Sequence, residues 1–519
     1  MKKRFILTAL AAALIITSAG CGEKKETVKT GADGKIVVDW VPQNDSPVDN
    51  NSPIVAEYEK KYGVDFNFIY MDRNQGAELL NVRIAGGEIP DVFTVNDSQY
   101  RTYAKQGVLS EVKEETLKEK APNFYELAKQ NGEESIWEAM KENGKIYGIP
   151  SLSPNGKYHI VPIWRDDWLK KVGIDKIPET IDEAEEAFYK FVNEDPDGDG
   201  QKDTYAMSTY GIHAVLNAYG GHPLKFYWTE RDGKIIQSAV LPEMKDALAR
   251  LNKWYKDGLI DPEFITGENK GQYWANSPGF TNGMLGFTAN GMAYHISDTK
   301  RDKEKPASFW SQFKQLQGED SSYAPGKPLT GPFGHMGAEH WGTFSGGGVA
   351  LGKNVGTDTE KQYKILNIFE TLNSNYDEYI FANYGREGIE WEMRDGLIIQ
   401  LIEDTKKRQS LGLLANGIMR ATVNLEFVNR VEDPEAVEYA QKHAMHADID
   451  HYRNIVWGGL PSDGMYKAIV TQKVEENYYA FITGARSIDE WDAFVAELNA
   501  AGLETLTKEA NEWYEARYK

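Results

Sequence analysis

The 519-residue sequence contains a single cysteine, Cys21. One thiol cannot form a disulfide within the chain, so large hydrophobic cores must stabilise the protein instead. Its length is enough for two or more such cores. Apolar runs are also scarce: beyond the first twenty residues no stretch is long and apolar enough to span a bilayer. We therefore expect no spanning helix in the mature protein.

Basic residues are in the minority. The chain has 58 Lys and Arg against 79 Asp and Glu, which gives a formal net charge of −21. Without the three basic residues of positions 1–20, the balance becomes 55 against 79 and the charge −24. Nucleic acids and anionic membrane surfaces are bound through basic footprints. The charge therefore argues against both as partners.

The first twenty residues have the pattern of a secretory signal. Lys2, Lys3 and Arg4 precede an apolar run over residues 5–16, which is too short to span a membrane, and small residues lead to Cys21. Cys21 stands where a bacterial lipoprotein signal places the lipidated residue. We expect a lipoprotein signal peptide at 1–20, lipidation of Cys21 and a polar tether at 21–34. The mature protein would then be lipid-anchored at the extracellular face of the cell membrane.

A dense acidic stretch at residues 195–203 has the spacing of a calcium-binding loop. Carboxylates occupy its first, third, fifth and ninth positions, Gly200 allows the sharp turn at the sixth, and the seventh offers a backbone carbonyl. The twelfth position is Ala206 instead of Glu, and no helical pattern follows, so a helix–loop–helix sensor is excluded. We predict a structural Ca²⁺ held by Asp195, Asp197, Asp199, Gln201 and Asp203. An ion-free acidic surface turn is the alternative.

Strand and helix patterns alternate after the tether. Apolar runs at 35–40, 64–70 and 92–95 predict buried strands, and helices are expected from Pro53 to Gly63 and around 77–85. This order is typical of an open, mostly parallel sheet with helices on its faces. Ligands bind beyond the carboxyl ends of such strands, so the loops after Trp40 and Val95 are candidate binding loops.

Helix boundaries are also readable further along the chain. Thr180 and Glu183 form a capping-box pattern before an apolar helical face that runs into the acidic loop. Pro242 begins a helix that Asp257 and Gly258 end.

Four short segments carry a family resemblance. They read Gly-Gly-Glu-Ile-Pro-Asp-Val at 86–92, Gly-Lys-Ile-Tyr-Gly-Ile-Pro at 144–150, Arg-Asp-Asp-Trp-Leu at 165–169 and Tyr-Lys-Asp-Gly-Leu-Ile-Asp-Pro at 255–262. Together, and in this order, they resemble motifs of the extracellular solute-binding lipoproteins of carbohydrate ABC importers. The acidic loop is similar to the calcium loop of the large subgroup that includes alginate-binding proteins. That subgroup usually has Glu after the ninth-position Asp, where this chain has Thr204.

The resemblance implies an α/β, two-lobed periplasmic-binding-protein-like fold with a hinge between the lobes. We expect the first lobe to comprise 35–160 plus about 290–350, and the second 161–289 plus about 351–519. The function implied is that of a substrate-binding subunit of an ABC importer, not an enzyme. As a monomer, it would capture an oligosaccharide by lobe closure and deliver it to the membrane permease.

Residues 270–350 are rich in glycine and aromatic residues, which suit the apolar faces and polar edges of sugars. For any single aromatic residue, packing in the core is the alternative. The resemblance places aromatic residues near Phe287 and Trp391 against the sugar, and we expect the other ligand contacts from the predicted loops. The expected ligand-binding residues are Trp40, Asn44, Asp91, Arg165, Trp274, Phe287, Trp341, Trp391 and Trp457.

Two other functions stay open at this stage: a secreted carbohydrate-active enzyme such as a glycoside hydrolase, and a peptide-binding importer subunit. The chain has neither a G-x-S-x-G elbow nor a G-x-x-x-x-G-K-[ST] phosphate loop. The paired carboxylates of a glycosidase are close in space only and cannot be recognised among 79 acidic residues. His443 and His446 have a spacing that suits a transition metal or a solvated helix surface.

Overall fold

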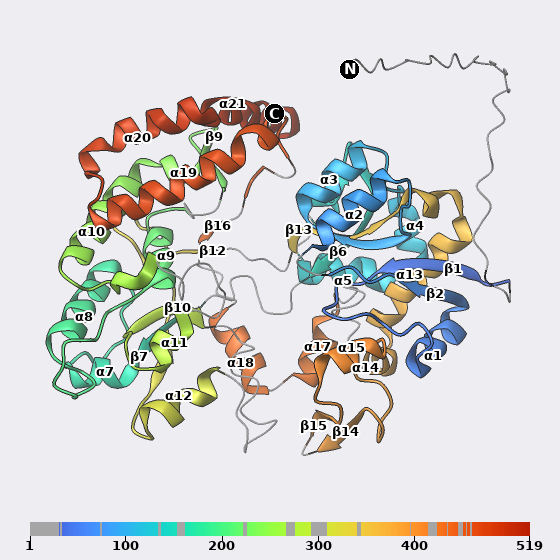
Figure 1. The fold of residues 1–519 in the computed structure, drawn as a ribbon, viewed down its shortest axis with the longest axis horizontal. Coiled ribbons are helices and arrows are strands. Elements are labelled where there is room, and N and C mark those ends of the chain that lie inside the picture. The colour runs from blue at the N-terminus through green and yellow to red at the C-terminus, as the bar shows by residue number, and fades with distance from the viewer. Residues whose placement is uncertain are drawn as a thin grey trace, which may run out of the picture.

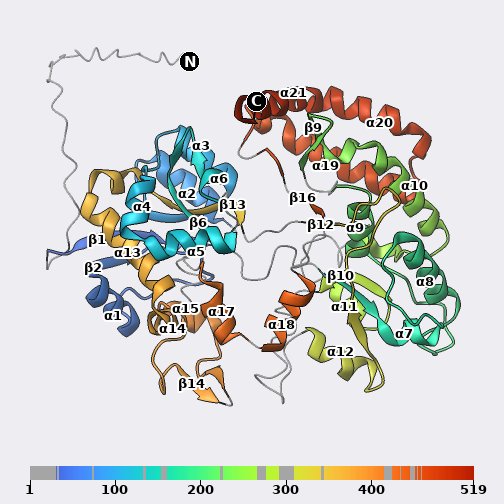
Figure 2. The same ribbon diagram turned by 180° about the vertical axis from the view of Figure 1, so that it is seen from behind.

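The computed structural model describes residues 31, 34–72, 75–132, 136–152, 161–221, 226–265, 276–291, 309–339, 344–394, 396–413, 423–432, 434–444, 450–452, 454–456 and 459–518. Figures 1 and 2 show that the elements gather into two lobes, which lie side by side. Each lobe has a large hydrophobic core of its own. The expected α/β, two-lobed fold is confirmed.

The first lobe is built on a five-stranded sheet with the order β2-β1-β3-β13-β6. β1 runs parallel to β2 and β3, whereas β13 is antiparallel to both of its neighbours. The three strands predicted near the N-terminus are therefore parallel as expected, whereas the sheet as a whole is mixed because of β13. The elements of this lobe are β1 (Ile36–Val41), α1 (Pro53–Tyr62), β2 (Val64–Phe68), α2 (Gly76–Ala85), β3 (Val92–Val95), α3 (Asp97–Lys105), α4 (Glu114–Lys120), α5 (Pro122–Gly132), α6 (Ile136–Ala139), β4 (Lys141–Glu142), β5 (Lys145–Ile146), β6 (Gly148–Leu152), β13 (Phe344–Leu351), α13 (Thr359–Ser374), α14 (Tyr376–Tyr384), β14 (Trp391–Arg394), β15 (Leu397–Gln400), α15 (Thr405–Ser410) and α17 (Leu425–Val431).

Local sequence explains where the first elements begin and end. Ser52 caps α1 by accepting the N–H of Val55, Pro53 occupies the first turn, and the helix ends before Gly63. β1 alternates buried and half-buried residues up to Trp40, so one face of the strand is fully buried and the other is partly covered. Its Trp40 ring packs between Phe66 of β2 and Phe369 of α13, so sheet and helix share one core.

The second lobe is mainly helical, around a three-stranded antiparallel sheet of order β10-β7-β11. Trp164 of β7, Phe188 of α8 and Phe287 of β10 stack together at its centre. The elements are β7 (Val161–Arg165), α7 (Asp166–Lys171), α8 (Ile181–Asn193), α9 (Thr209–Ala218), β8 (Trp228–Arg231), β9 (Lys234–Gln237), α10 (Pro242–Lys256), α11 (Asn276–Thr281), β10 (Phe287–Gly291), α12 (Phe309–Gln317), β11 (Tyr323–Pro325), β12 (Gly337–Glu339), α18 (Pro434–His443), β16 (Asp450–Tyr452), α19 (Asp463–Thr483), α20 (Trp491–Leu498) and α21 (Glu504–Tyr518).

Within the described residues, the chain changes lobe at three places: between Leu152 and Val161, between Glu339 and Phe344, and between Glu432 and Pro434. The expected lobe boundaries are therefore wrong in two parts. Residues 309–339 belong to the second lobe, because β11 pairs with β7. Residues 351–432 belong to the first lobe, because α13, Leu413 and Val423 pack into its core. Residues 344–350 lie in that lobe as expected, in β13 between β3 and β6.

In the ranges that the structure describes, no helix is long and apolar enough to cross a membrane. The predicted signal peptide, Cys21 and nearly all of the tether lie outside the described residues.

Candidate functional site

The predicted binding loops lie where the parallel strands of the first lobe end. Asn44 follows β1 and is 1% exposed, and neither its amide nitrogen nor its amide oxygen makes a hydrogen bond. A buried amide without a partner costs about 1–3 kcal/mol relative to one with a partner. Asn44 therefore stays a candidate contact for a ligand hydroxyl.

Asp91 and Lys361 form a buried ion pair beside the same strand ends. The Lys361 ammonium lies 2.9 Å from the Asp91 carboxylate, which also accepts the backbone N–H of Asp39 at 2.9 Å. Burial raises the pKa of Asp91, although Lys361 and this N–H favour its charged form. The expected ligand role of Asp91 is not supported, because its carboxylate already joins β1, β3 and α13.

Trp40 is also a structural residue. Its side chain is 1% exposed and packs in the first core. The expectation that it contacts a ligand is therefore wrong for the side chain in this structure.

Arg165 is fully engaged within the second lobe. Its guanidinium makes two hydrogen bonds of 2.9 and 2.7 Å to the carboxylate of Asp167, and a third of 3.1 Å to Gln317. It also stacks on Trp168 and Phe313. Because its charge is neutralised and buried, Arg165 is not placed to bind a ligand, contrary to the expectation.

The two aromatic residues expected to stack on a sugar are buried. Phe287 has no exposed surface and lies 4.4 Å, centroid to centroid, from Trp164. Trp391 is 8% exposed, donates its indole N–H to the carbonyl of Gly385 at 3.0 Å and packs in a small cluster beneath α14 and α17. Both expectations are corrected: these rings hold the protein together. Trp274, Trp341 and Trp457 lie outside the described residues.

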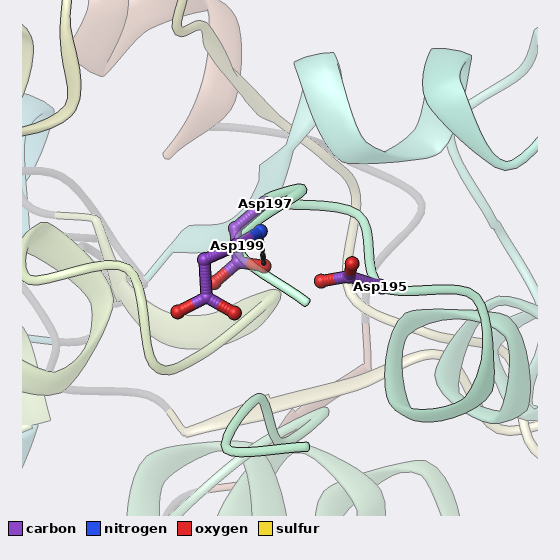
Figure 3. Close-up of side chains that lie close together, drawn as sticks. All are labelled: Asp195, Asp197 and Asp199. Atoms are coloured by element: carbon purple, nitrogen blue, oxygen red, sulfur yellow. Dashed lines mark hydrogen bonds between the residues drawn. The ribbon is translucent and has the colours of Figure 1, made fainter. Parts of the chain in front are cut away.

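The acidic loop brings three of its predicted ligands together. One oxygen each from Asp195, Asp197 and Asp199 lies within 4.8 Å of the others, and Figure 3 shows the three side chains on one short loop. The carboxylate of Asp203 is not in this group. An EF-hand commonly engages its ninth position through water, so that arrangement does not exclude a cation.

Backbone geometry shapes this loop. Asp195 adopts a left-handed conformation directly after α8, and Gly200 has φ +80° at the sharp turn. The N–H groups of Gly200 and Gln201 are donated to Asp195 and Asp199, at 3.0 and 2.7 Å. Burial, and then the neighbouring carboxylates of Asp195 and Asp199, raise the pKa of Asp197.

Sequence reasoning missed the polar face of α9. Tyr210, His213 and Asn217 line a hollow together with residues of β7, β10 and β12. The elements α9, β10 and β12 lie on the side of the second lobe that faces the first in Figures 1 and 2. The helical spacing of Tyr210, His213 and Asn217 was the only signal of this polar face in the sequence. The rest of the helix is apolar and contains a glycine, so neither the helix nor its polar face was predicted.

Comparison with known proteins agrees with this architecture. Lipoprotein LipO of Bacillus subtilis (strain 168) is 25% identical over 543 residues, covering 99% of each chain. The polygalacturonan/rhamnogalacturonan-binding protein YtcQ of the same organism is 22% identical, covering 98% of each. The crystal structure of alginate-binding protein AlgQ2 without calcium ion superposes with a TM-score of 0.63 over 92% of this chain and 98% of that one, at 17% identity.

The family profile of the bacterial extracellular solute-binding proteins matches residues 51–314, half of the chain. The match begins just before α1 and ends in α12, so it includes the parallel strands β2 and β3 of the first lobe and the strands β7 and β10 of the second. The chain therefore belongs to the family of bacterial extracellular solute-binding proteins.

Proposed function

We propose that this protein is the substrate-binding subunit of an ABC importer that captures an oligosaccharide between its lobes and delivers it to a membrane permease. The observation that carries the proposal is that this member of the extracellular solute-binding family has two separate hydrophobic cores, between which the described part of the chain crosses three times. Two bodies joined by a few connections can close around a ligand. The names of YtcQ and AlgQ2 support a carbohydrate as the ligand class.

A thermal-shift screen against oligosaccharides, followed by calorimetric titration of the hits, tests this function. A ligand that binds the folded state alone stabilises it by about 2.7 kcal/mol at a hundredfold excess over Kd. Peptides form the comparison panel. Stabilisation by peptides and by no saccharide would contradict the proposal.

We infer that the protein binds its ligand without converting it. Family and relatives are binding proteins. A bound saccharide should therefore be recovered unchanged after long incubation, and a shortened glycan in the chromatogram would instead indicate a glycoside hydrolase.

We propose that Asp195, Asp197 and Asp199 hold a structural Ca²⁺, with the carbonyl of Gln201 and a water-mediated contact from Asp203 completing the site. Carboxylate and carbonyl oxygens are the ligands that calcium prefers. The support is the convergence of the three carboxylates on one short loop. Thermal melting with and without a chelator tests this site.

We further propose that lipid on Cys21 anchors the protein at the extracellular face of the membrane, as the name of LipO suggests for that relative. Replacement Cys21→Ala should release the protein into the medium or leave it unprocessed. Unchanged partitioning into the detergent phase would contradict lipidation.

A further inference from the structure

The second lobe has a hollow beside α9. The elements α9, β10 and β12, which supply lining residues, lie on the side of this lobe that faces the first. The hollow is bounded by α9, by Pro162 of β7 and by Ala289 of β10. The empty space of the hollow, counted together with the open solvent at its mouth, is about 420 Å³. Neither the family match nor any residue expected from the sequence assigns a role to this place.

One face of α9 supplies the polar groups of the hollow. Tyr210, His213 and Asn217 stand three and four residues apart, so they share a helical face. The rings of Tyr210 and His213 meet edge to face, with centroids 5.7 Å apart. Asn217 is 7% exposed, and its amide oxygen is buried without a hydrogen bond. A donor on a ligand, such as a sugar hydroxyl, would satisfy that oxygen.

The wall opposite the helix is held in place by close packing. A Cβ at Gly331 would lie 1.8 Å from the carbonyl oxygen of Ala218, the last residue of α9. The loop that contains Thr330 and Gly331 is therefore in close contact with the end of this helix. Thr330 accepts the N–H of Ile181 at 3.0 Å and donates its own N–H to Glu179 at 2.8 Å. Leu329 and Ala338, which line the hollow, flank this fixed loop. The hollow is therefore formed before any ligand arrives, which lowers the entropy cost of binding.

The described residues that line the hollow include no Lys, Arg, Asp or Glu. The arginine expected to serve a ligand, Arg165, is committed to Asp167. The described lining offers a buried carboxylate no permanently charged cation, only the imidazole of His213, and an unpaired buried charge is far more costly than an unpaired hydroxyl. The chemistry of the hollow therefore favours a ligand unit without charge.

We propose that this hollow is a subsite for an uncharged sugar unit, with Asn217 bonded to a hydroxyl and Tyr210 and His213 against the ring. The inference rests on the proposed oligosaccharide function and adds two things to it: the place of one sugar on the second lobe, and its class. A uronate at this subsite is excluded by the proposal, although YtcQ and AlgQ2 are named for acidic polysaccharides.

Calorimetric titration of the full mature chain tests the subsite. The probes are neutral fructo-, galacto- and manno-oligosaccharides, and oligogalacturonates and oligoalginates of matched length. We expect the tightest binder to be neutral, and Asn217→Ala to weaken it at least tenfold. Ala214→Leu, which fills the hollow from the same helix, should abolish binding.

Asn499→Ala, an exposed amide change in the same lobe, is the matched control and should leave affinity unchanged. Melting of each unliganded variant separates lost binding from lost folding, and Asn217→Leu, nearly equal in size but without an acceptor, serves if the alanine variant does not fold. Binding of uronates alone, or wild-type affinity in both Ala214→Leu and the folded Asn217 variant, would overturn the subsite and leave the proposed function standing. No binding of any saccharide would overturn both.

Discussion

Phe287 illustrates how packing decides the role of a side chain. Its ring is fully buried between Trp164 and Phe188, where two strands and a helix of the second lobe meet. Replacing a buried Phe with Ala costs about 3–5 kcal/mol because burial is lost and a cavity remains. We therefore expect Phe287→Ala to lower the free energy of unfolding of the unliganded protein by that amount in urea titrations.

The control is Phe333→Ala, since that ring is 48% exposed. Surface substitutions usually change stability by less than about 0.5 kcal/mol. If Phe287→Ala instead lost sugar affinity at unchanged stability, the ring would have to face the ligand, and the core assignment would be wrong.

Glu114 is a second residue with a measurable signature. Its carboxylate accepts hydrogen bonds from Lys118 and Tyr125, each at 2.8 Å, and lies 3.3 Å from the ammonium of Lys141. The bond from Lys118 is the largest cause that lowers the pKa of Glu114, and the three together lower it to about 2. A carboxyl whose pKa is depressed in the folded state stabilises the fold above its unfolded pKa, about 4.3.

This stabilisation is lost as the pH falls from about 4.3 towards 2, because the unfolded chain then takes up the proton first. We expect Glu114→Gln to melt at a lower temperature than the wild type at pH 7, and the difference to shrink below pH 4. The site is partly exposed, so the effect is small. A difference between the two proteins that stayed constant from pH 7 to pH 3 would contradict the lowered pKa.

At the scale of elements, the acidic loop joins α8 to the core of the second lobe. After the loop, Thr204 donates its hydroxyl to the carbonyl of Phe191 in α8, at 3.0 Å. Two residues on, Ala206 accepts the N–H of Phe287 at the start of β10. A cation bound by Asp195, Asp197 and Asp199 would fix the end of the helix and the entry into this pairing.

Calcium should therefore stabilise the fold. At a hundredfold excess over Kd the gain is about 2.7 kcal/mol, measured as a higher melting temperature with Ca²⁺ than with a chelator. Asp199→Ala should remove the response, and Asp246→Ala, an exposed carboxylate on α10, should keep it.

Sugar affinity should change little on chelation, because α8 lies on the outer side of the second lobe, away from the first (Figure 1). If neither calcium nor a chelator changed the melting temperature of the wild type, the calcium site would be contradicted and the loop would be an ion-free acidic turn. Loss of sugar binding in step with loss of calcium would place the ion at the ligand.

At the scale of the whole molecule, each lobe has its own core, and within the described residues the chain passes between the lobes at three places. A ligand shifts an equilibrium between open and closed forms only by the difference in its affinity for the two. A sugar that contacts both lobes meets this condition, since the first lobe presents Asn44 and the second the polar face of α9.

Small-angle X-ray scattering should then show a smaller radius of gyration with a saturating sugar than without it. A saccharide that gives no thermal shift is the control and should leave the radius unchanged. A tight ligand that leaves the radius of gyration unchanged would mean that binding does not close the lobes.

Local structure was determined by the sequence alone, because its causes lie within a few residues of each other. The α1 helix begins at Pro53 and ends before Gly63 as predicted, and β3 occupies residues 92–95. The capping box of α8 is formed by the predicted pair, Thr180 and Glu183. The convergence of the Asp195, Asp197 and Asp199 carboxylates was also predicted from their spacing, because all three belong to one short turn.

Only the tertiary structure decided which lobe each segment joins and which side chains stay free. β13 enters the first sheet about 200 residues after its neighbour β6, a pairing that no local pattern contains. Arg165 was expected to bind a ligand, but its guanidinium is bonded to Asp167 and Gln317. Phe287 was expected to stack on a sugar, but its ring packs against Trp164 and Phe188. The hollow beside α9 depends on walls from four distant segments. Burial and pairing are properties of contacts between remote parts of the chain, so residue types and spacing could not reveal them.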